Sequence, residues 1–349
     1  MDINILFSSY GVKPNGGFLI AYRYANELAK RGHRINLIHT PSIRSLPVRF
    51  YKWIAAFLKM RSAKNLWFHF EENVNRKYCF SLREKNIPDA DITMATTWQT
   101  AVILNGYTPK KGRKFYLIQG YETWFGHKEE VDTTWHYNMT KIVISQWLLK
   151  LGENMGCRDL HYIPNALDGK KYGVYSDPYS REKIITMNYA KEEFKGSRDG
   201  VEAMKLARKQ IPVLRCVAFG KDKRPSHLPD WIEYHENPAQ DFLVKQIYNR
   251  SYIYLCTSWQ EGWGLPPMEA MACGSAVITT DNGGVRDFAI DGENALYCKM
   301  KDPRDMAEKI IALHEDKSLH DRLVRSGLEK IPQFSWDRSV QLLEKLFLS

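Results

Sequence analysis

The sequence predicts an α/β protein built from two doubly wound domains. Apolar segments typical of strands alternate with helical segments along nearly the whole chain. The alternation is interrupted by a turn-rich stretch near the middle and then restarts. The length of 349 residues corresponds to two domains at roughly 150 residues each. Alternating strands and helices favour parallel sheets that carry helices on both faces.

A βαβ unit opens the chain. Residues 3–8 form a short apolar strand, residues 18–31 have helical periodicity, and residues 34–39 are the next expected strand. Gly32 stands where a helix C-cap belongs. Further strands of the first half are expected over residues 92–96, 114–119, 141–145 and 160–163.

The second half has the same alternation. Strands are expected over residues 184–188, 213–219, 252–256, 276–280 and 295–298. Helices are expected over residues 198–209, 240–249, 267–272, 303–315, 318–330 and 336–347. The corresponding division is a first domain over 1–165, a linker over 166–182, a second domain over 183–334, and a C-terminal helix over 335–349 that packs back on the first domain. In open parallel sheets ligands bind at the carboxyl ends of strands, so both domains are expected to present loops to a cleft.

Composition excludes several classes of protein. No apolar stretch approaches the ~20 residues that span a bilayer, and the first residues lack the features of a secretory signal. Six scattered cysteines without a Cys-x-x-Cys pair are typical of reduced thiols in the cytoplasm. Ten histidines show no metal-ligand spacing, so none of them is expected to bind a metal. The pair Asp89 and Asp91 is interpreted as part of a turn.

The net charge of +10 is concentrated in one early segment. Between Glu27 and Glu71 there are nine Lys and Arg residues and no Asp or Glu. Such a concentrated positive field indicates an anionic partner. Nucleic acid is disfavoured, because no recognition motif accompanies the charge.

The segment over residues 256–280 is the strongest candidate for a binding site. An apolar strand leads into a loop that contains two glycines, and a helix follows. The backbone amides of Gly264 and Leu265 at the helix start suit an anion. Glu261 precedes the helix and Glu269 lies within it, and carboxylates can accept hydrogen bonds from vicinal hydroxyls. The simpler alternative is that Glu269 favours the helix dipole and Glu261 is a solvated loop charge.

The same segment resembles the donor-binding signature of retaining glycosyltransferases of family 4, which have the GT-B fold. The resemblance rests on Glu261 and Glu269, separated by seven residues, and continues through residues 276–292. Residues 163–168 resemble the segment that links the two GT-B domains. Residues 115–125 resemble the subset of these enzymes that acts on bacterial surface polysaccharides.

The resemblance implies a role for each residue of this segment. Glu261 would contact the donor sugar and Glu269 the ribose hydroxyls, while the amides of Gly264 and Leu265 would hold the diphosphate. Lys195 matches a family cation that meets the diphosphate, so Lys195 and Glu261 are the expected catalytic residues. The tryptophans that flank Glu261 are candidates to line the donor pocket, namely Trp259 and Trp263.

The first domain carries a second resemblance. Gly16 and Gly17, between the first strand and the first helix, resemble the family's glycine loop, which approaches donor phosphate and acceptor. An ordinary βα turn is the alternative. A Gly-x-Gly-x-x-Gly fingerprint is absent from residues 10–18, which disfavours a nicotinamide-dependent oxidoreductase.

The sequence departs from the family pattern at two places. Many relatives have an arginine a few residues before the Lys-Gly pair, and here only Lys191 could substitute for it. Many relatives also have a His-Asp pair where this chain has Gln119 and Gly120. Glu122 is a neighbour of that position without an assigned role.

The expected function is that of a retaining, metal-independent glycosyltransferase. It would move a sugar from a nucleotide-diphosphate donor to a glycan or lipid-linked hydroxyl acceptor, in polysaccharide or glycolipid assembly. No cofactor is expected besides a nucleotide-sugar substrate. Two alternatives are a sugar-nucleotide epimerase and a catalytically silent partner that binds nucleotide or membrane.

The acid-free segment also predicts an amphipathic helix. Its apolar side chains lie on a single helical face, at positions Phe50, Trp53, Ile54, Phe57 and Leu58. Cations surround this face, among them Arg49, Lys52 and Lys59. This composition is typical of an interfacial membrane anchor. The expected location is the cytoplasm, with the protein peripheral at the inner face of the membrane. The alternative is a helix that packs this face on its own domain.

Overall fold

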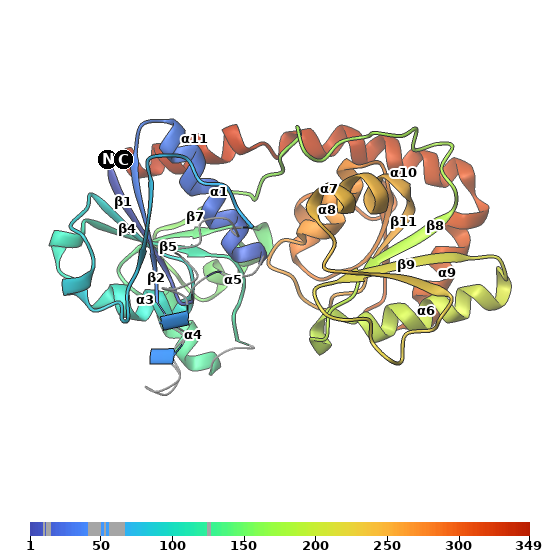
Figure 1. Cartoon of the computed structure of the whole chain (residues 1–349), viewed down its shortest axis with the longest axis horizontal. Helices are drawn as coiled ribbons and strands as arrows, with labels where there is room; N and C mark the ends of the chain where they lie inside the picture. Colours follow the sequence, from blue (N-terminus) through green and yellow to red (C-terminus); the bar gives the residue numbers. More distant parts are fainter. Residues whose placement is uncertain (10, 12–14, 41–49, 52–53, 56–66, 124–126) are drawn as a thin grey trace. The chain divides into compact units, whose positions relative to one another are not determined.

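The computed structural model describes residues 1–9, 11, 15–40, 50–51, 54–55, 67–123 and 127–349 (Figure 1). The chain forms two compact units. The first consists of Met1–Asn165 and Trp336–Ser349, and the second consists of Ala166–Ser335. In the described residues, each unit has one sheet whose strands all pair in parallel. Two α/β domains with parallel sheets confirm the predicted fold class.

The first unit contains, within the described residues, a seven-stranded sheet in the order β3-β2-β1-β4-β5-β6-β7. The strands are β1 (Asp2–Phe7), β2 (Arg34–His39), β3 (Val74–Tyr78), β4 (Ile92–Ala95), β5 (Arg113–Ile118), β6 (Thr140–Val143) and β7 (Leu160–Tyr162). The helices are α1 (Gly16–Lys30), α3 (Trp98–Asn105), α4 (Lys128–Trp135), α5 (Gln146–Asn154) and α11 (Trp336–Leu348), with 3₁₀ turns at η2 (Glu84–Asn86) and η3 (Pro109–Lys111).

The C-terminal helix α11 belongs to the first unit. Its apolar face packs toward α1 and the sheet, where Trp336 meets Tyr24 and Phe347 meets Phe115 at ring distances of 5.2 and 4.9 Å. On the polar side Arg31, at the end of α1, donates hydrogen bonds to carboxylates of α11 at 2.6 and 3.0 Å. The last helix of the first unit therefore comes after the second unit in the sequence.

The second unit contains, within the described residues, a six-stranded sheet in the order β10-β9-β8-β11-β12-β13. The strands are β8 (Ile184–Asn188), β9 (Arg215–Gly220), β10 (Ile232–Glu236), β11 (Ser251–Cys256), β12 (Ala276–Thr280) and β13 (Ala295–Cys298). The helices are α6 (Ser197–Gln210), α7 (Gln240–Phe242), α8 (Leu265–Ala272), α9 (Pro303–Glu315) and α10 (Lys317–Lys330). Shorter turns are η4 (Glu193–Lys195), η5 (Leu243–Ile247), η6 (Tyr248–Arg250), η7 (Gly284–Asp287) and η8 (Ile331–Gln333).

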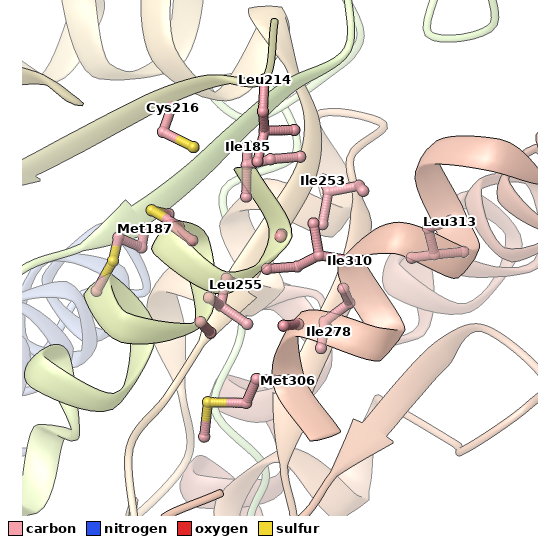
Figure 2. Close-up of a cluster of buried hydrophobic side chains, with 14 of the residues drawn as sticks. Ile185, Met187, Leu214, Cys216, Ile253, Leu255, Ile278, Met306, Ile310 and Leu313 are labelled. Atoms are coloured by element: carbon pink, nitrogen blue, oxygen red, sulfur yellow. The ribbon is translucent and has the colours of Figure 1, made fainter. Parts of the chain in front are cut away.

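The core of the second unit lies between this sheet and the helices α6 and α9 (Figure 2). The strands β8, β11 and β12 contribute Ile185, Ile253 and Ile278, all fully buried. Ile310 and Leu313 of α9 pack against them at a helical spacing of three. The near-continuous apolar sequence of these strands is the pattern of a sheet covered on both faces. This rigid sheet positions the loops that follow its strands.

Three features differ from the sequence-based expectation. The edge strands β3 and β10 were not predicted, because each is only five residues long and contains three polar residues. The helix expected over 240–249 is a succession of the short turns α7, η5 and η6. The segment 166–182, expected to link the domains, lies within the second unit. There Arg181 donates to the carbonyl oxygen of Cys273 at 2.7 Å.

Candidate functional site

In the second unit the strand order reverses between β8 and β11. The connections that follow these two parallel strands diverge from one another, and this is the place where open α/β sheets bind ligands. Lys195 follows β8 and Glu261 follows β11, and their side chains form an ion pair with Nζ and Oε1 2.6 Å apart. Lys195 and Glu261 are 66 positions apart in the sequence, and the fold brings them into contact. The sequence had assigned both to one site.

The loops that carry this ion pair are held by backbone interactions. Thr257 donates from its hydroxyl to the carbonyl oxygen of Lys195 at 2.8 Å, and the amide of Trp259 donates to Phe194 at 2.7 Å. The amide of Glu261 donates to the carbonyl oxygen of Asn282 at 3.0 Å. The side chains of Lys195 and Glu261 remain 29% and 17% exposed. Hydrogen bonds therefore hold the loops that carry both groups, and both side chains remain partly exposed.

The start of α8 supplies two backbone donors to the same edge of the sheet. Gly264 adopts φ +96°, a left-handed conformation that favours glycine. In the described part of the chain, the amides of Gly264 and Leu265 donate no hydrogen bond to a protein acceptor. Pro266 and Pro267 have no amide proton to offer. The amides of Gly264 and Leu265 are therefore the free donors at the positive, N-terminal end of the α8 dipole within the described residues.

Glu269 lies inside α8 and is buried, with 7% of its surface exposed. Burial raises the pKa of its carboxyl group to about 7, and hydrogen bonds from Tyr172 and Tyr248 oppose the rise. The hydroxyl of Tyr248 donates to Oε2 at 2.9 Å. The alternative of a carboxylate that only favours the helix dipole does not account for these phenols. Neither tyrosine belongs to the sequence signature, and no local pattern indicated them.

Lys191 is placed differently from Lys195. Its ammonium lies 3.4 Å from the carboxylate of Asp222, and the two side chains are largely exposed. An exposed pair of this kind contributes little to stability. Lys191 therefore lies beyond the carboxyl end of β8 with an exposed surface partner.

One expectation about the tryptophans is wrong. Trp263 is buried at 2% exposure and packs against Phe288 and Phe334, so it belongs to the core of the second unit. Trp259 lies nearer the surface, with its indole nitrogen donating to Asp199 at 2.9 Å and the ammonium of Lys301 3.8 Å from its ring centre. Of the two tryptophans, Trp259 retains an accessible face.

The sheet of the first unit reverses its order between β1 and β4. Gly16 and Gly17 start α1, and the side chain of Asn15 caps the helix by accepting from the amide of Gly17 at 2.9 Å. A Cβ atom on Gly17 would lie 3.5 Å from the side-chain amide of Gln119. The predicted glycine loop and the position that replaces the His-Asp pair are therefore neighbours.

Glu122 lies at the same edge of the first sheet. Its Oε2 accepts a hydrogen bond from the amide of Trp98, at the start of α3, at 2.9 Å. Burial raises the pKa of this carboxyl group to about 7. A titratable carboxyl group thus caps the start of α3, three residues after Gln119, and the sequence pattern assigned it no role.

The predicted amphipathic helix falls mainly on residues outside the described part of the chain, which excludes Arg49, Lys52, Trp53, Phe57 and Lys59. Two residues of its apolar face are described. Phe50 is 56% exposed and Ile54 is 37% exposed. Among the described residues, no helix combines the length and apolar character needed to cross a bilayer.

The described residues contain no group of three His, Cys, Asp or Glu side chains arranged to hold a metal ion. The Asp89 carboxylate pairs with the ammonium of Lys111 at 2.7 Å. Asp91 accepts from the amide of Asp2 at 2.8 Å. Both aspartates therefore hold chain segments together in the first unit.

Residues 176–330 match the family described as glycosyl transferases group 1. A stretch of 104 residues is 37% identical to an uncharacterized glycosyltransferase of Methanocaldococcus jannaschii, covering 30% of each chain. Another of 133 residues is 26% identical to an N,N'-diacetylbacillosaminyl-diphospho-undecaprenol alpha-1,3-N-acetylgalactosaminyltransferase of Campylobacter jejuni, covering 37% of this chain and 35% of that protein. The matched regions therefore span about a third of the length of these curated relatives.

The structure resembles Anabaena Alr3699/HepE in complex with UDP-glucose. The TM-score is 0.76 at 15% identity, over 99% of both chains. A match over the whole chain at this level of identity concerns the fold. It confirms the predicted GT-B fold, and the family match over residues 176–330 agrees with the resemblance to glycosyltransferases seen in the sequence.

Proposed function

Residues 176–330 belong to the glycosyl transferases group 1 family, and on this premise we propose that the protein transfers a sugar from a nucleotide-diphosphate donor to a hydroxyl acceptor. The observation that carries the proposal is the pair of Lys195 and Glu261 at the switch point of the second sheet. Beside it, α8 begins with two amides that lack a protein acceptor in the described residues. A cation and amide donors suit a diphosphate, and a carboxylate suits sugar hydroxyls.

The departing diphosphate gains negative charge as its bond to the anomeric carbon breaks. Lys195, the amides of Gly264 and Leu265, and the α8 dipole are fixed before the reaction and stabilise that charge. The acceptor oxygen forms the new bond on the face that the diphosphate leaves, and its proton passes to the diphosphate. The configuration of the sugar is thereby retained. Glu261 exchanges its contact with Lys195 for the hydroxyls of the sugar, and Glu269 accepts the ribose hydroxyls.

The first unit is proposed to bind the acceptor. Its glycine loop, Gln119 and Glu122 are polar features near the switch point of its sheet. A glycan or lipid-linked acceptor agrees with the name of the Campylobacter jejuni relative, which includes a diphospho-undecaprenol. The basic segment around Trp53 would then hold the enzyme reversibly at the inner face of an anionic membrane, near such an acceptor.

The function is tested with a panel of radiolabelled nucleotide sugars incubated with the full chain in the absence of acceptor. Slow release of a nucleoside diphosphate with free sugar supports the transferase. An epimerised donor would support an epimerase instead, and the absence of any turnover would support a silent binding partner. Glu261→Gln should abolish the release, whereas Glu315→Gln, an exposed carboxylate at the end of α9, should not.

A further inference from the structure

The carboxyl group of Glu269 lies at the end of a chain of hydrogen-bonded side chains that no sequence motif indicates. This hydrogen-bond series consists of Lys171, Gln240, Tyr172 and Glu269. The phenol of Tyr248 donates to Oε2 of Glu269 at 2.9 Å, and the phenol of Tyr172 bonds to the same carboxyl group. Tyr172 and Tyr248 are 7% and 0% exposed. A carboxylate buried between two phenols has the hydrogen bonds that burial of a charge requires.

The direction of these hydrogen bonds is fixed by the series itself. Lys171 can only donate, so the side-chain oxygen of Gln240 must face its ammonium, at 2.6 Å. The amide nitrogen of Gln240 then faces Tyr172 and donates to the phenol oxygen. Tyr172 must therefore direct its own hydrogen toward Glu269. The series runs from an ammonium to a carboxylate, and each bond polarises the next.

The two phenols leave acceptor capacity on the carboxylate. An ionised carboxyl group offers about four lone-pair sites. The phenols use two of these, and about two remain, the number that a vicinal pair of ribose hydroxyls requires. The orientation of the carboxylate plane is therefore determined by the two tyrosines.

We propose that Tyr172 and Tyr248 are positioning residues that orient the Glu269 carboxylate toward the ribose hydroxyls of the donor, and that Lys171 and Gln240 polarise Tyr172 for this task. The proposal rests on the proposed function, since it assumes a nucleotide donor. It adds four residues to the ribose site, none of which belongs to the signature.

The electrostatic environment of Glu269 supports this role. Burial raises the pKa of the carboxyl group, while the two phenols and the charge of Lys171 lower it. Among the described residues, the titratable groups that interact with Glu269 are Lys171, Tyr172, Tyr248, Tyr254 and Cys273. Lys171 is the cation of this set. Loss of a phenol hydroxyl therefore favours the neutral carboxyl group, which is a poorer acceptor for two hydroxyls.

The test compares nucleotides that differ only in the ribose. UDP, GDP and ADP are titrated by calorimetry into the full chain, and the one that binds most tightly is titrated again in its 2′,3′-dideoxy form. Tyr172→Phe and Tyr248→Phe should each weaken binding of the ribonucleotide by about tenfold, because a misoriented Glu269 carboxylate loses one of its hydrogen bonds to the ribose hydroxyls. They should leave binding of the dideoxynucleotide within about twofold.

Two controls separate positioning from a general effect on the fold. Tyr297→Phe removes a phenol of the same unit, whose hydroxyl donates to the Ala289 carbonyl oxygen at 2.8 Å, and should change neither affinity. Gln240→Leu should weaken ribonucleotide binding in the same direction as Tyr172→Phe. It leaves the bond between Tyr248 and Glu269 in place, so it also serves if Tyr248→Phe does not fold.

Three other results would contradict the proposed function, the ribose role of Glu269 or the role of the tyrosines. A wild-type chain that binds no nucleoside diphosphate would overturn the proposed function and this inference with it. Equal affinity of the wild type for the ribo- and dideoxynucleotides would remove Glu269 from the ribose site. Wild-type discrimination that survives unchanged in both phenylalanine variants would leave the proposed function intact and overturn the positioning role of the tyrosines.

Discussion

At the level of single residues, the two glutamates of the donor signature are held in different environments. Glu261 is partly exposed and paired with Lys195, whereas Glu269 is buried and bonded to two phenols. An exposed carboxylate can change partners when a ligand arrives, because water stabilises it in the interval. A buried carboxylate must be positioned in advance. This difference leads to separate expectations for the two residues.

Glu269→Gln should weaken binding of a nucleoside diphosphate, because a ribose hydroxyl pair loses a charged acceptor. Loss of a hydrogen bond to a charged group costs about 1.5–3 kcal/mol, or roughly 10- to 150-fold in Kd. Glu261→Gln should instead lower turnover more than affinity for the free diphosphate, since Glu261 is assigned to the sugar. Calorimetric titration of both variants decides this, and unchanged affinity in Glu269→Gln would refute the assignment.

The raised pKa of Glu269 predicts a dependence of stability on pH. The folded carboxyl group has a pKa of about 7, above its ordinary value of 4.5, because burial disfavours the charged form. The folded state therefore binds the proton more tightly, and the group's contribution to stability falls as pH rises from about 4.5 to 7. A shift of this size corresponds to about 3 kcal/mol.

Glu269→Gln removes this titration. The Tm of the variant relative to that of the wild type should therefore increase as the pH is raised from 4.5 to 7.5 in thermal melting experiments. Glu315→Gln serves as the exposed control and should show no such trend. A Tm difference for Glu269→Gln that is independent of pH would contradict the raised pKa.

At the level of elements, the start of α8 depends on one glycine. A Cβ atom on Gly264 would lie 3.0 Å from Cγ1 of Val285, in addition to the penalty of φ +96°. Gly264→Ala should lower stability by about 1–2 kcal/mol from the left-handed backbone alone. It should also weaken diphosphate binding, because the amides of Gly264 and Leu265 shift. Gly292 is the matched control: its φ is +72° and a Cβ there meets no atom within 4 Å.

Gly292→Ala should therefore show the backbone penalty in a melting curve without a change in diphosphate affinity. Equal losses of affinity in Gly264→Ala and Gly292→Ala would indicate that α8 contributes no donors to the ligand.

The predicted amphipathic helix is the second element with a testable role. Its cations should attract the protein to anionic liposomes at about 1 kcal/mol each, and its aromatic residues should insert at the interface. Sedimentation with such liposomes should decrease with added salt and with the double variant Trp53→Ser/Phe57→Ser. Val213, 84% exposed in the second unit, provides the control variant Val213→Ser. A double variant that sediments like the wild type would favour packing of this face on its own domain.

At the level of the whole molecule, the chain passes twice between its units, at residues 165–166 and 335–336. The last element of the first unit, α11, follows the whole second unit in sequence. The second unit gathers the proposed diphosphate ligands from two loops, with Lys195 after β8 and the amides of Gly264 and Leu265 after β11. These groups are supplied by the protein itself.

Sugar transfer by the full chain should therefore persist in excess chelator. Turnover with the donor identified by the panel is measured before and after EDTA treatment. Complete loss of turnover, restored by Mg²⁺ or Mn²⁺, would show that a cation other than Lys195 meets the diphosphate.

Local sequence was sufficient to predict most elements of the second unit. The strands β8, β12 and β13 and the helix α9 have the bounds expected from the sequence. Apolar runs and a helix cap such as Asp302, which accepts from the amides of Arg304 and Asp305, are properties of contiguous residues. The same holds for the donor signature, whose loop and helix lie within one short segment.

The tertiary structure decided the features that depend on contacts between distant segments. The strands β3 and β10 have mixed polarity and exist through pairing with β2 and β9. Trp263 was predicted to line the donor pocket, but it is buried in the core of the second unit. The phenols of Tyr172 and Tyr248 reach Glu269 only because the sheet brings distant loops to one place. A sequence records which side chains can bond, but the strand order and the burial that follows from it determine which of them meet.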